Sequence, residues 1–245
     1  MSRVSPPVFV LLLFAAVAVV KAIWIPPRKP LEENKDYSKV ESVARIRSDF
    51  DNGNGNIIYS LEGHGANQAP FHVFVVDPIT GFIRVTRTLD REFISMYNLS
   101  GVAMYKDGTR AEDDVSIPFK VVDVNDNSPV FGIIEPGEVN ELSAVGTTVM
   151  KITATDADEP DNENSQIAYS IINQSPSHGM FGITKDGYIY VINSALDREA
   201  ADQYTLTVRG QDLNGKPEGN TGTGTVIINV RDVNDHLPTL EKDRS

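Results

Sequence analysis

The residues of this chain that could do chemistry are gathered in short acidic motifs. Leu-Asp-Arg-Glu occurs at residues 89–92 and again at 196–199, and Asp-Val-Asn-Asp occurs at 123–126 and again at 232–235. Within the first motif two acids stand two residues apart, as they do in Asp-Ala-Asp at 156–158. Residues two apart on an extended chain point to the same side, so each pair could face one ion. Oxygen atoms of this kind are the ligands of a hard divalent cation such as calcium, which takes 6–8 of them.

We therefore expect a calcium site that gathers oxygen atoms from several segments of the chain. The candidate ligand residues are Glu33, Asp90, Glu92, Asn125, Asp126, Asn127, Asp156, Asp158, Asn164 and Asp212. One such acid alone would be interpreted as a solvated loop charge, whereas the repeated set favours metal. A second, partial calcium site is expected from Glu141, Asp197, Glu199, Asn234 and Asp235. His236 directly follows Asp235.

The spacing of these motifs indicates an internal repeat. Each motif recurs about 110 residues after its first copy, which is the length of an ordinary domain. Both copies contain short apolar runs separated by turn dipeptides such as Asn52-Gly53 and Asp186-Gly187, and neither shows a sustained helical period. We predict an all-β chain of two tandem seven-stranded Greek-key β-sandwiches, with barrels as the alternative. The repeats are drawn at residues 23–131 and 132–239, with 240–245 as the start of a further linker.

Composition narrows the class of function. The chain has 245 residues, with 22 Lys and Arg against 34 Asp and Glu, a formal net charge of -12. Such a balance argues against nucleic acid as a partner, because phosphates would be repelled. The chain contains no cysteine, so disulfides, thiolate metal sites and cysteine nucleophiles are excluded.

The N-terminus predicts secretion. Arg3 precedes an apolar run over residues 8–20, which is too short to span a bilayer about 30 Å thick as a helix. Residues 1–22 are therefore expected to be a signal peptide, with an uncleaved anchor as the alternative. This chain alone would be secreted, and a membrane connection would come only through a region that it does not contain.

The acidic motifs resemble the calcium signature of cadherin extracellular repeats. The resemblance rests on LDRE, DxNDN and DAD at these separations and extends from Trp24 to about Pro238. It implies an immunoglobulin-like, cadherin-type sandwich and three calcium ions at the junction of the two repeats. It also implies that Asn125 contributes its side-chain oxygen, and that Val124, Asn127 and Asn164 contribute backbone carbonyls. Shared ions would convert a floppy joint into a stiff rod.

Within that family the sequence is similar to the desmosomal cadherins, and among them to the desmogleins. The matching segments include residues 33–39, 44–49 and 156–160. The similarity implies a glycoprotein on the extracellular side of the plasma membrane, at a desmosome or other cell junction. Its partners would be cadherins on the opposing cell, either homophilic or in desmoglein–desmocollin pairs.

The N-terminal segment around Trp24 is the part of the chain expected to mediate adhesion. Trp24 is the only tryptophan, and an indole buries a large apolar area. By resemblance it would enter a pocket of the opposing molecule, lined by Ala103, while Glu112 would pair with the new terminal amine. The alternatives are that Trp24 docks only in its own domain, and that the chain is a non-adhesive calcium-binding spacer. Asn98 and Asn173 begin N-glycosylation sequons.

An enzyme is the remaining rival class. Paired carboxylates can serve glycoside hydrolysis, but here each acid pair recurs in both repeats, where a catalytic pair would be expected once. The sequence contains neither a nucleophile elbow nor a phosphate-binding loop. The sequence therefore favours binding over catalysis.

Overall fold

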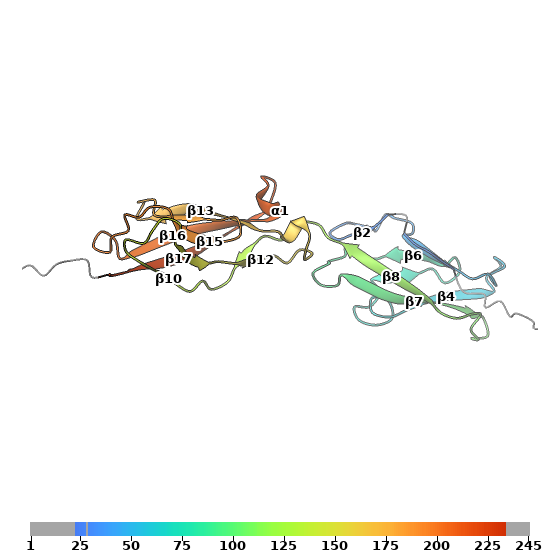
Figure 1. Ribbon diagram of the computed structural model, residues 1–245. Helices are drawn as coiled ribbons and strands as arrows, with labels where there is room; N and C mark the ends of the chain where they lie inside the picture. Colours follow the sequence, from blue (N-terminus) through green and yellow to red (C-terminus); the bar gives the residue numbers. More distant parts are fainter. Residues whose placement is uncertain (1–22, 28, 234–245) are drawn as a thin grey trace, which may run out of the picture. The chain divides into compact units, whose positions relative to one another are not determined.

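The computed structural model describes residues 23–27 and 29–233, which form two compact units that meet between Val122 and Asp123. The regular secondary structure of both units is almost entirely β-strand (Figure 1), which confirms the predicted all-β class. The predicted signal peptide and residues 234–245, with Asn234, Asp235 and His236 among them, lie outside the described residues. No helix within the described ranges is long and apolar enough to cross a membrane.

Unit 1 is a sandwich of two four-stranded sheets, ordered β1-β3-β6-β5 and β2-β8-β7-β4. The chain passes back and forth between the sheets, as a Greek-key sandwich requires. Its strands are β1 (Ile23–Ile25), β2 (Leu31–Glu32), β3 (Ala44–Arg47), β4 (Ile57–Glu62), β5 (Phe74–Val76), β6 (Phe82–Val85), β7 (Met96–Tyr105) and β8 (Val115–Val122).

The first strand of unit 1 is divided between the two sheets. β1 pairs antiparallel with β3, whereas β2 pairs parallel with β8. Between β1 and β2 stand Pro26, Pro27 and Pro30, which have no backbone N–H to continue a ladder. The division detaches the segment that carries Trp24 from the strand that leads to Glu33.

The core of unit 1 lies between its sheets. Phe74 and Phe119 stack at a centroid distance of 4.5 Å, and Tyr97 packs edge-on against Phe74 at 5.0 Å. Gly81 has φ +72° and lies so close to the Ile46 carbonyl that an added Cβ would be 2.1 Å from its oxygen, so only glycine fits this turn. Gly187 has the same role in unit 2, where its added Cβ would be 2.4 Å from the Ile152 oxygen.

Unit 2 repeats the sandwich with small differences. Its largest sheet has the order β10-β17-β16-β13, and the facing strands form the order β11-β15-β14 and the pair β12-β9. The two short helices lie together at one end of the unit (Figure 1). The elements are β9 (Val130–Phe131), β10 (Gly137–Asn140), β11 (Thr148–Lys151), β12 (Ala154–Thr155), η1 (Glu163–Ser165), β13 (Ala168–Ser175), β14 (Phe181–Ile183), β15 (Tyr188–Val191), β16 (Gln203–Gln211), α1 (Asp212–Gly215) and β17 (Thr221–Arg231).

The linker segment packs as part of unit 2, whereas the predicted first repeat extends to Phe131. β9 pairs with β12, and the Phe131 ring lies edge-on to Tyr169 at 6.0 Å. Gly222 passes so close to Pro129 that an added Cβ would be 1.8 Å from the Pro129 oxygen. These contacts place the division of the chain before Asp123, because burial of Phe131 holds the preceding residues against unit 2.

Candidate metal centre

Three aspartates converge at one end of unit 2. Asp156 and Asp158 follow β12, and Asp212 follows β16 at the start of α1. One carboxylate oxygen from each lies within 4.8 Å of the others. Asp212 is fully buried and Asp158 is 1% exposed. Three negative side chains so close together would repel one another unless a cation or protons neutralised them.

Four of the six carboxylate oxygens of this cluster lack the partners that buried polar atoms normally have. Among the described residues, no hydrogen bond reaches Asp156 Oδ2, Asp158 Oδ2 or either oxygen of Asp212. The side-chain oxygen of Asn125 is buried and without a hydrogen bond in the same way. Buried oxygens without donors are what a hard cation requires as ligands, so these residues fit the calcium that the sequence predicts.

The linker is hydrogen-bonded to the same end of unit 2. Asn127 donates to Asp158 Oδ1 from its backbone at 3.3 Å and from its side chain at 2.8 Å. Asp126 lies beside it and accepts a hydrogen bond from the Asn127 side chain at 2.8 Å. Val124, which is predicted to contribute its backbone carbonyl, has a side chain that is 38% exposed. The structure thus brings Asn127 and Asp158 together, as predicted for one site.

Asp123, the first acid of the DxNDN motif, binds the loop that leads to η1. Its Oδ1 accepts from the Glu159 amide at 2.9 Å, and its Oδ2 accepts from the side chains of Asn162 at 3.2 Å and Asn164 at 2.7 Å. These bonds occupy the Asn164 side chain, which is consistent with the predicted use of its backbone carbonyl. Asp123 therefore anchors the loop that carries two of the predicted ligands.

Unit 1 holds the predicted acids Glu33, Asp90 and Glu92 at the end of its buried strands. Glu33 follows β2, is 2% exposed, and accepts from the Arg91 amide at 2.7 Å. Glu33 and Glu92 each offer an oxygen within 4.8 Å of the other. Asp90 accepts from the Phe93 amide at 2.9 Å. Burial, followed by the hydrogen bond with Glu33, raises the pKa of Glu92.

Leu89 and Arg91 of the Leu-Asp-Arg-Glu motif explain how its acids are placed. The Leu89 side chain is buried in the core, so the residues after it emerge at the end of the unit. The Arg91 guanidinium forms an ion pair with Glu92. Arg91 thereby supplies one positive charge beside two carboxylates, which reduces their mutual repulsion.

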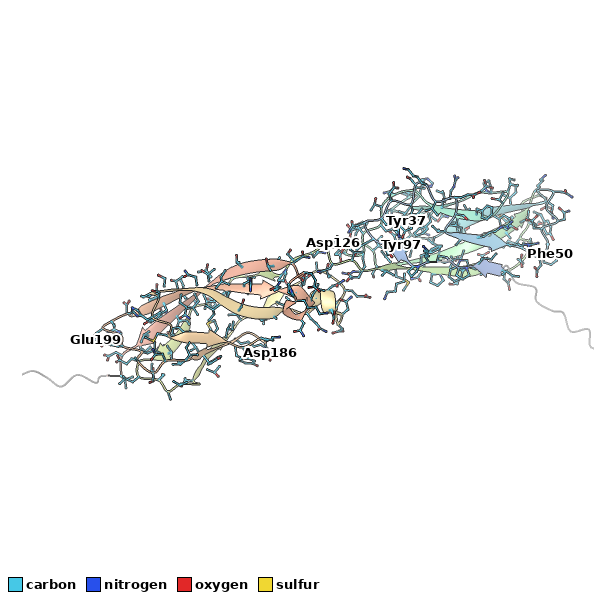
Figure 2. The ribbon with its side chains drawn as sticks, turned by 90° about the horizontal axis from the view of Figure 1, so that it is seen from above. Tyr37, Phe50, Tyr97, Asp126, Asp186 and Glu199 are labelled. Carbon is cyan, nitrogen blue, oxygen red and sulfur yellow. The ribbon has the colours of Figure 1, made fainter. Side chains whose placement is uncertain are left out.

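Three acids predicted for the second, partial site lie close together in unit 2. Glu141, Asp197 and Glu199 each offer an oxygen within 4.8 Å of one another. Glu141 repeats the geometry of Glu33, since it is 2% exposed and accepts from the Arg198 amide at 3.1 Å. Within unit 2, Glu199 and Asp126 lie at opposite ends (Figure 2), so the two groups of predicted ligands are separate.

Ionisation of Asp158 should change the stability of metal-free protein. Burial, and then the charge of Asp156, raise the pKa of Asp158 to about 6 from 3.8. Between these values the folded state holds a proton that the unfolded state has released, so stability is present below about pH 4 and is lost as the pH rises through about 6. In calcium-free buffer, we expect the free energy of unfolding of the wild type to fall with pH relative to that of Asp158→Asn. Urea unfolding across this pH range measures the difference, and a difference independent of pH would contradict the expectation.

The predicted adhesive residues all lie in unit 1. Trp24, in β1, packs against the core of its own unit and meets the Phe119 ring edge-on at 6.1 Å. Ala103, in β7, is 2% exposed and belongs to the same core cluster. Within the described part of the chain, Trp24 Nε1 and both carboxylate oxygens of Glu112 are buried without a hydrogen bond. Trp24 thus docks in its own domain here, which is the arrangement that a closed monomer requires.

Both predicted glycosylation positions are accessible. Asn98 lies on β7 and Asn173 on β13, and both side chains are exposed. A glycan can attach only where the asparagine reaches solvent, so the structure permits both sequons.

Comparisons with known proteins identify the family of this chain. The model of the cadherin domain matches residues 29–122 and 135–231. The chain belongs to the cadherin family. Among curated cadherins, mouse Desmoglein-2 is 40% identical over 226 residues, which is 90% of this chain and 20% of that protein. Mouse Cadherin-2 is 40% identical over 224 residues, 89% of this chain and 25% of that protein.

Solved cadherin structures share the fold. The human Desmocollin-1 ectodomain matches with a TM-score of 0.76 and 36% identity, covering 85% of this chain and 39% of that one. Chicken VE-cadherin EC1-2 matches with a TM-score of 0.69 and 32% identity, covering 82% of this chain and 96% of that one. The chain spans about a fifth to a quarter of the length of the curated cadherins cited above.

Proposed function

We propose that this chain is the calcium-dependent adhesive tip of a cell-surface cadherin. The observation that carries the proposal is the set of buried carboxylate oxygens without donors on Asp156, Asp158 and Asp212. A protein gains nothing from such a cluster in isolation, because each buried unpaired charge costs stability. The cluster becomes favourable when a divalent cation takes the place of the missing donors.

The proposed ligands come from both domains. Each domain would contribute oxygens to the three calcium ions expected at their junction. The first domain supplies Glu33, Asp90 and Glu92, and the second supplies Val124, Asn125, Asp126, Asn127, Asp156, Asp158, Asn164 and Asp212. When bound, calcium supplies positive charge that neutralises these acids and couples the two domains. Glu141, Asp197 and Glu199, with Asn234 and Asp235, would form part of a second junction of the same kind.

The adhesive step is proposed to be exchange of the N-terminal strand between opposing molecules. β1 is a short strand, separated from β2 by the proline-rich segment, so it can leave without disrupting β2. Trp24 would move from the core of its own domain to the equivalent site beside Ala103 of a second molecule. The two unpaired oxygens of Glu112 would accept from the terminal amine that signal cleavage creates. Because the closed and exchanged forms bury the same side chain, the net affinity would be weak.

The remaining assignments follow from family membership and the sequence. The partners would be cadherins on the opposing cell, through homophilic contact or desmoglein–desmocollin pairing, and the setting a desmosome or similar junction. Glycans on Asn98 and Asn173 suit a secreted route. The second candidate function is a calcium-binding spacer without adhesion, which the docking of Trp24 in its own domain would equally satisfy.

Calcium removal tests the proposed coupling of the domains. Small-angle X-ray scattering of the secreted chain in about 2 mM calcium, which suits extracellular affinities, should give a narrow distribution of intramolecular distances. In chelator, the acids of the junction repel and the two domains should move independently, so the distribution should broaden. The same comparison with sodium adjusted to equal ionic strength controls for screening. Identical profiles with calcium and with chelator would contradict the proposal.

A further inference from the structure

Asn220 is the residue through which three predicted ligand residues of unit 2 are connected. It stands at the end of the loop after α1, directly before β17. Its backbone oxygen accepts from the Asp212 amide at 3.1 Å. Its side-chain Nδ2 donates to the backbone oxygen of Asn127 at 2.7 Å and to that of Asn125 at 3.3 Å. One residue thus ties the buried aspartate to the linker, although its sequence position gives no motif by which to identify it.

The linker needs such a partner because it has no regular secondary structure. Residues 123–129 form neither strand nor helix, so no ladder satisfies or fixes their carbonyl groups. An amide side chain has two N–H donors, and here the amide nitrogen is within hydrogen-bonding distance of two carbonyls that are two residues apart. Each carbonyl oxygen has a second lone pair, so the Asn127 oxygen can accept from Asn220 and still bind a cation.

The residue before Asn220 reinforces this arrangement. An added Cβ on Gly219 would be 2.6 Å from the Asp212 carbonyl oxygen and 2.6 Å from its Oδ1. The loop is closed locally by the Gly219 amide, which donates to the Lys216 oxygen at 2.9 Å. Only a residue without a side chain lets the loop approach the Asp212 carboxylate so closely. The loop 216–220 therefore holds the backbone of Asp212 by a hydrogen bond and packs closely against its carboxylate.

We propose that Asn220 is a positioning residue of the calcium half-site in unit 2, an inference that rests on the proposed function. It touches no ion itself. It holds the carbonyls of Asn125 and Asn127 and the main chain of Asp212 in the relative positions that calcium binding requires. Groups that orient metal ligands commonly change metal affinity by 10–100-fold when they are removed.

The test is a calcium titration followed residue by residue. In ¹⁵N-labelled chain, the amides of Asp158, Gly219 and Asn127 should shift with calcium and report the affinity of the half-site. Asn220→Ala removes both side-chain donors and should weaken that affinity about tenfold. Asn220→Ser retains one donor and should give an intermediate affinity. Asn229→Ala is the matched control, because Asn229 lies further along β17, bonds Gln203 and should leave the affinity unchanged.

The outcomes separate positioning from simple loop stability. Thermal unfolding in chelator gives the structural contribution of Asn220 alone. Equal calcium affinity in wild type and Asn220→Ala, with a lower melting temperature for the variant in chelator and in calcium alike, would overturn the inference and leave the proposed function intact. Absence of any calcium-dependent shift in the wild type would overturn both.

Discussion

Replacing Asp212 with asparagine is expected to stabilise the second domain in chelator and to remove most of its stabilisation by calcium. Asp212 is fully buried, and both of its oxygens lack hydrogen bonds among the described residues. Neutralising such a group removes an uncompensated charge, whose desolvation costs about 1–3 kcal/mol or more. The same change takes a carboxylate ligand from the proposed site. The two effects have opposite signs and arise from one substitution.

Thermal or urea unfolding of the wild type and Asp212→Asn, each in chelator and in calcium, measures both effects. At about 2 mM calcium, a site with an extracellular affinity would stabilise the wild type by roughly 1–2 kcal/mol per ion. Asp186→Asn is the control, because Asp186 lies in an exposed turn of the same domain (Figure 2). An Asp212→Asn protein that loses stability in chelator, and is stabilised by calcium as much as the wild type, would contradict the assignment of Asp212.

Trp24→Ala is expected to abolish self-association and also to destabilise the first domain. The indole packs against the core of its own unit, and removing a large aromatic side chain from a core costs about 3–5 kcal/mol when burial is complete. Trp24 is only partly buried, so we expect about 2–3 kcal/mol. Sedimentation equilibrium in calcium should detect weak dimers of the wild type and only monomers of the variant.

The matched control for Trp24 is Ile25→Ala. Ile25 lies next to it in β1 but is 46% exposed, so its removal leaves the strand pairing and the core intact. The calcium concentration must be held constant, because the proposed adhesion depends on calcium as well as on Trp24. If Trp24→Ala were destabilised but associated as strongly as the wild type, strand exchange would be wrong and the spacer function would be favoured.

The sequence predicted the fold class because its period-2 runs and repeated motifs are local signals. The short apolar runs at residues 57–61 and 82–86 correspond closely to β4 and β6. Periodicity alone does not define β7, although it is the longest strand of unit 1. Residues 96–100 alternate in burial, but Gly101 to Met104 form an unbroken apolar run that has no period of two. Pairing with both β4 and β8 overrides these local preferences.

The acids of the candidate site were predictable, but the residues that hold them were not. Asp156 and Asp158 belong to a motif and Asp212 is a candidate acid of the sequence. Asn220, in contrast, lies about 95 residues from its linker partners and in a loop of ordinary composition. The proximity of such residues depends on how β16, α1 and β17 are arranged in space. The division before Asp123 was likewise missed, because it depends on burial of Phe131 against Tyr169.

Direct counting of bound calcium tests the central claim most simply. Equilibrium dialysis of the folded, secreted chain against calcium over the range of about 0.05–5 mM covers the affinities of extracellular sites. Binding of about three ions per chain with midpoints in that range is the predicted result, and Asp212→Asn should bind fewer. A folded chain that binds no calcium at millimolar concentrations would contradict the claim that these buried carboxylates form a metal site.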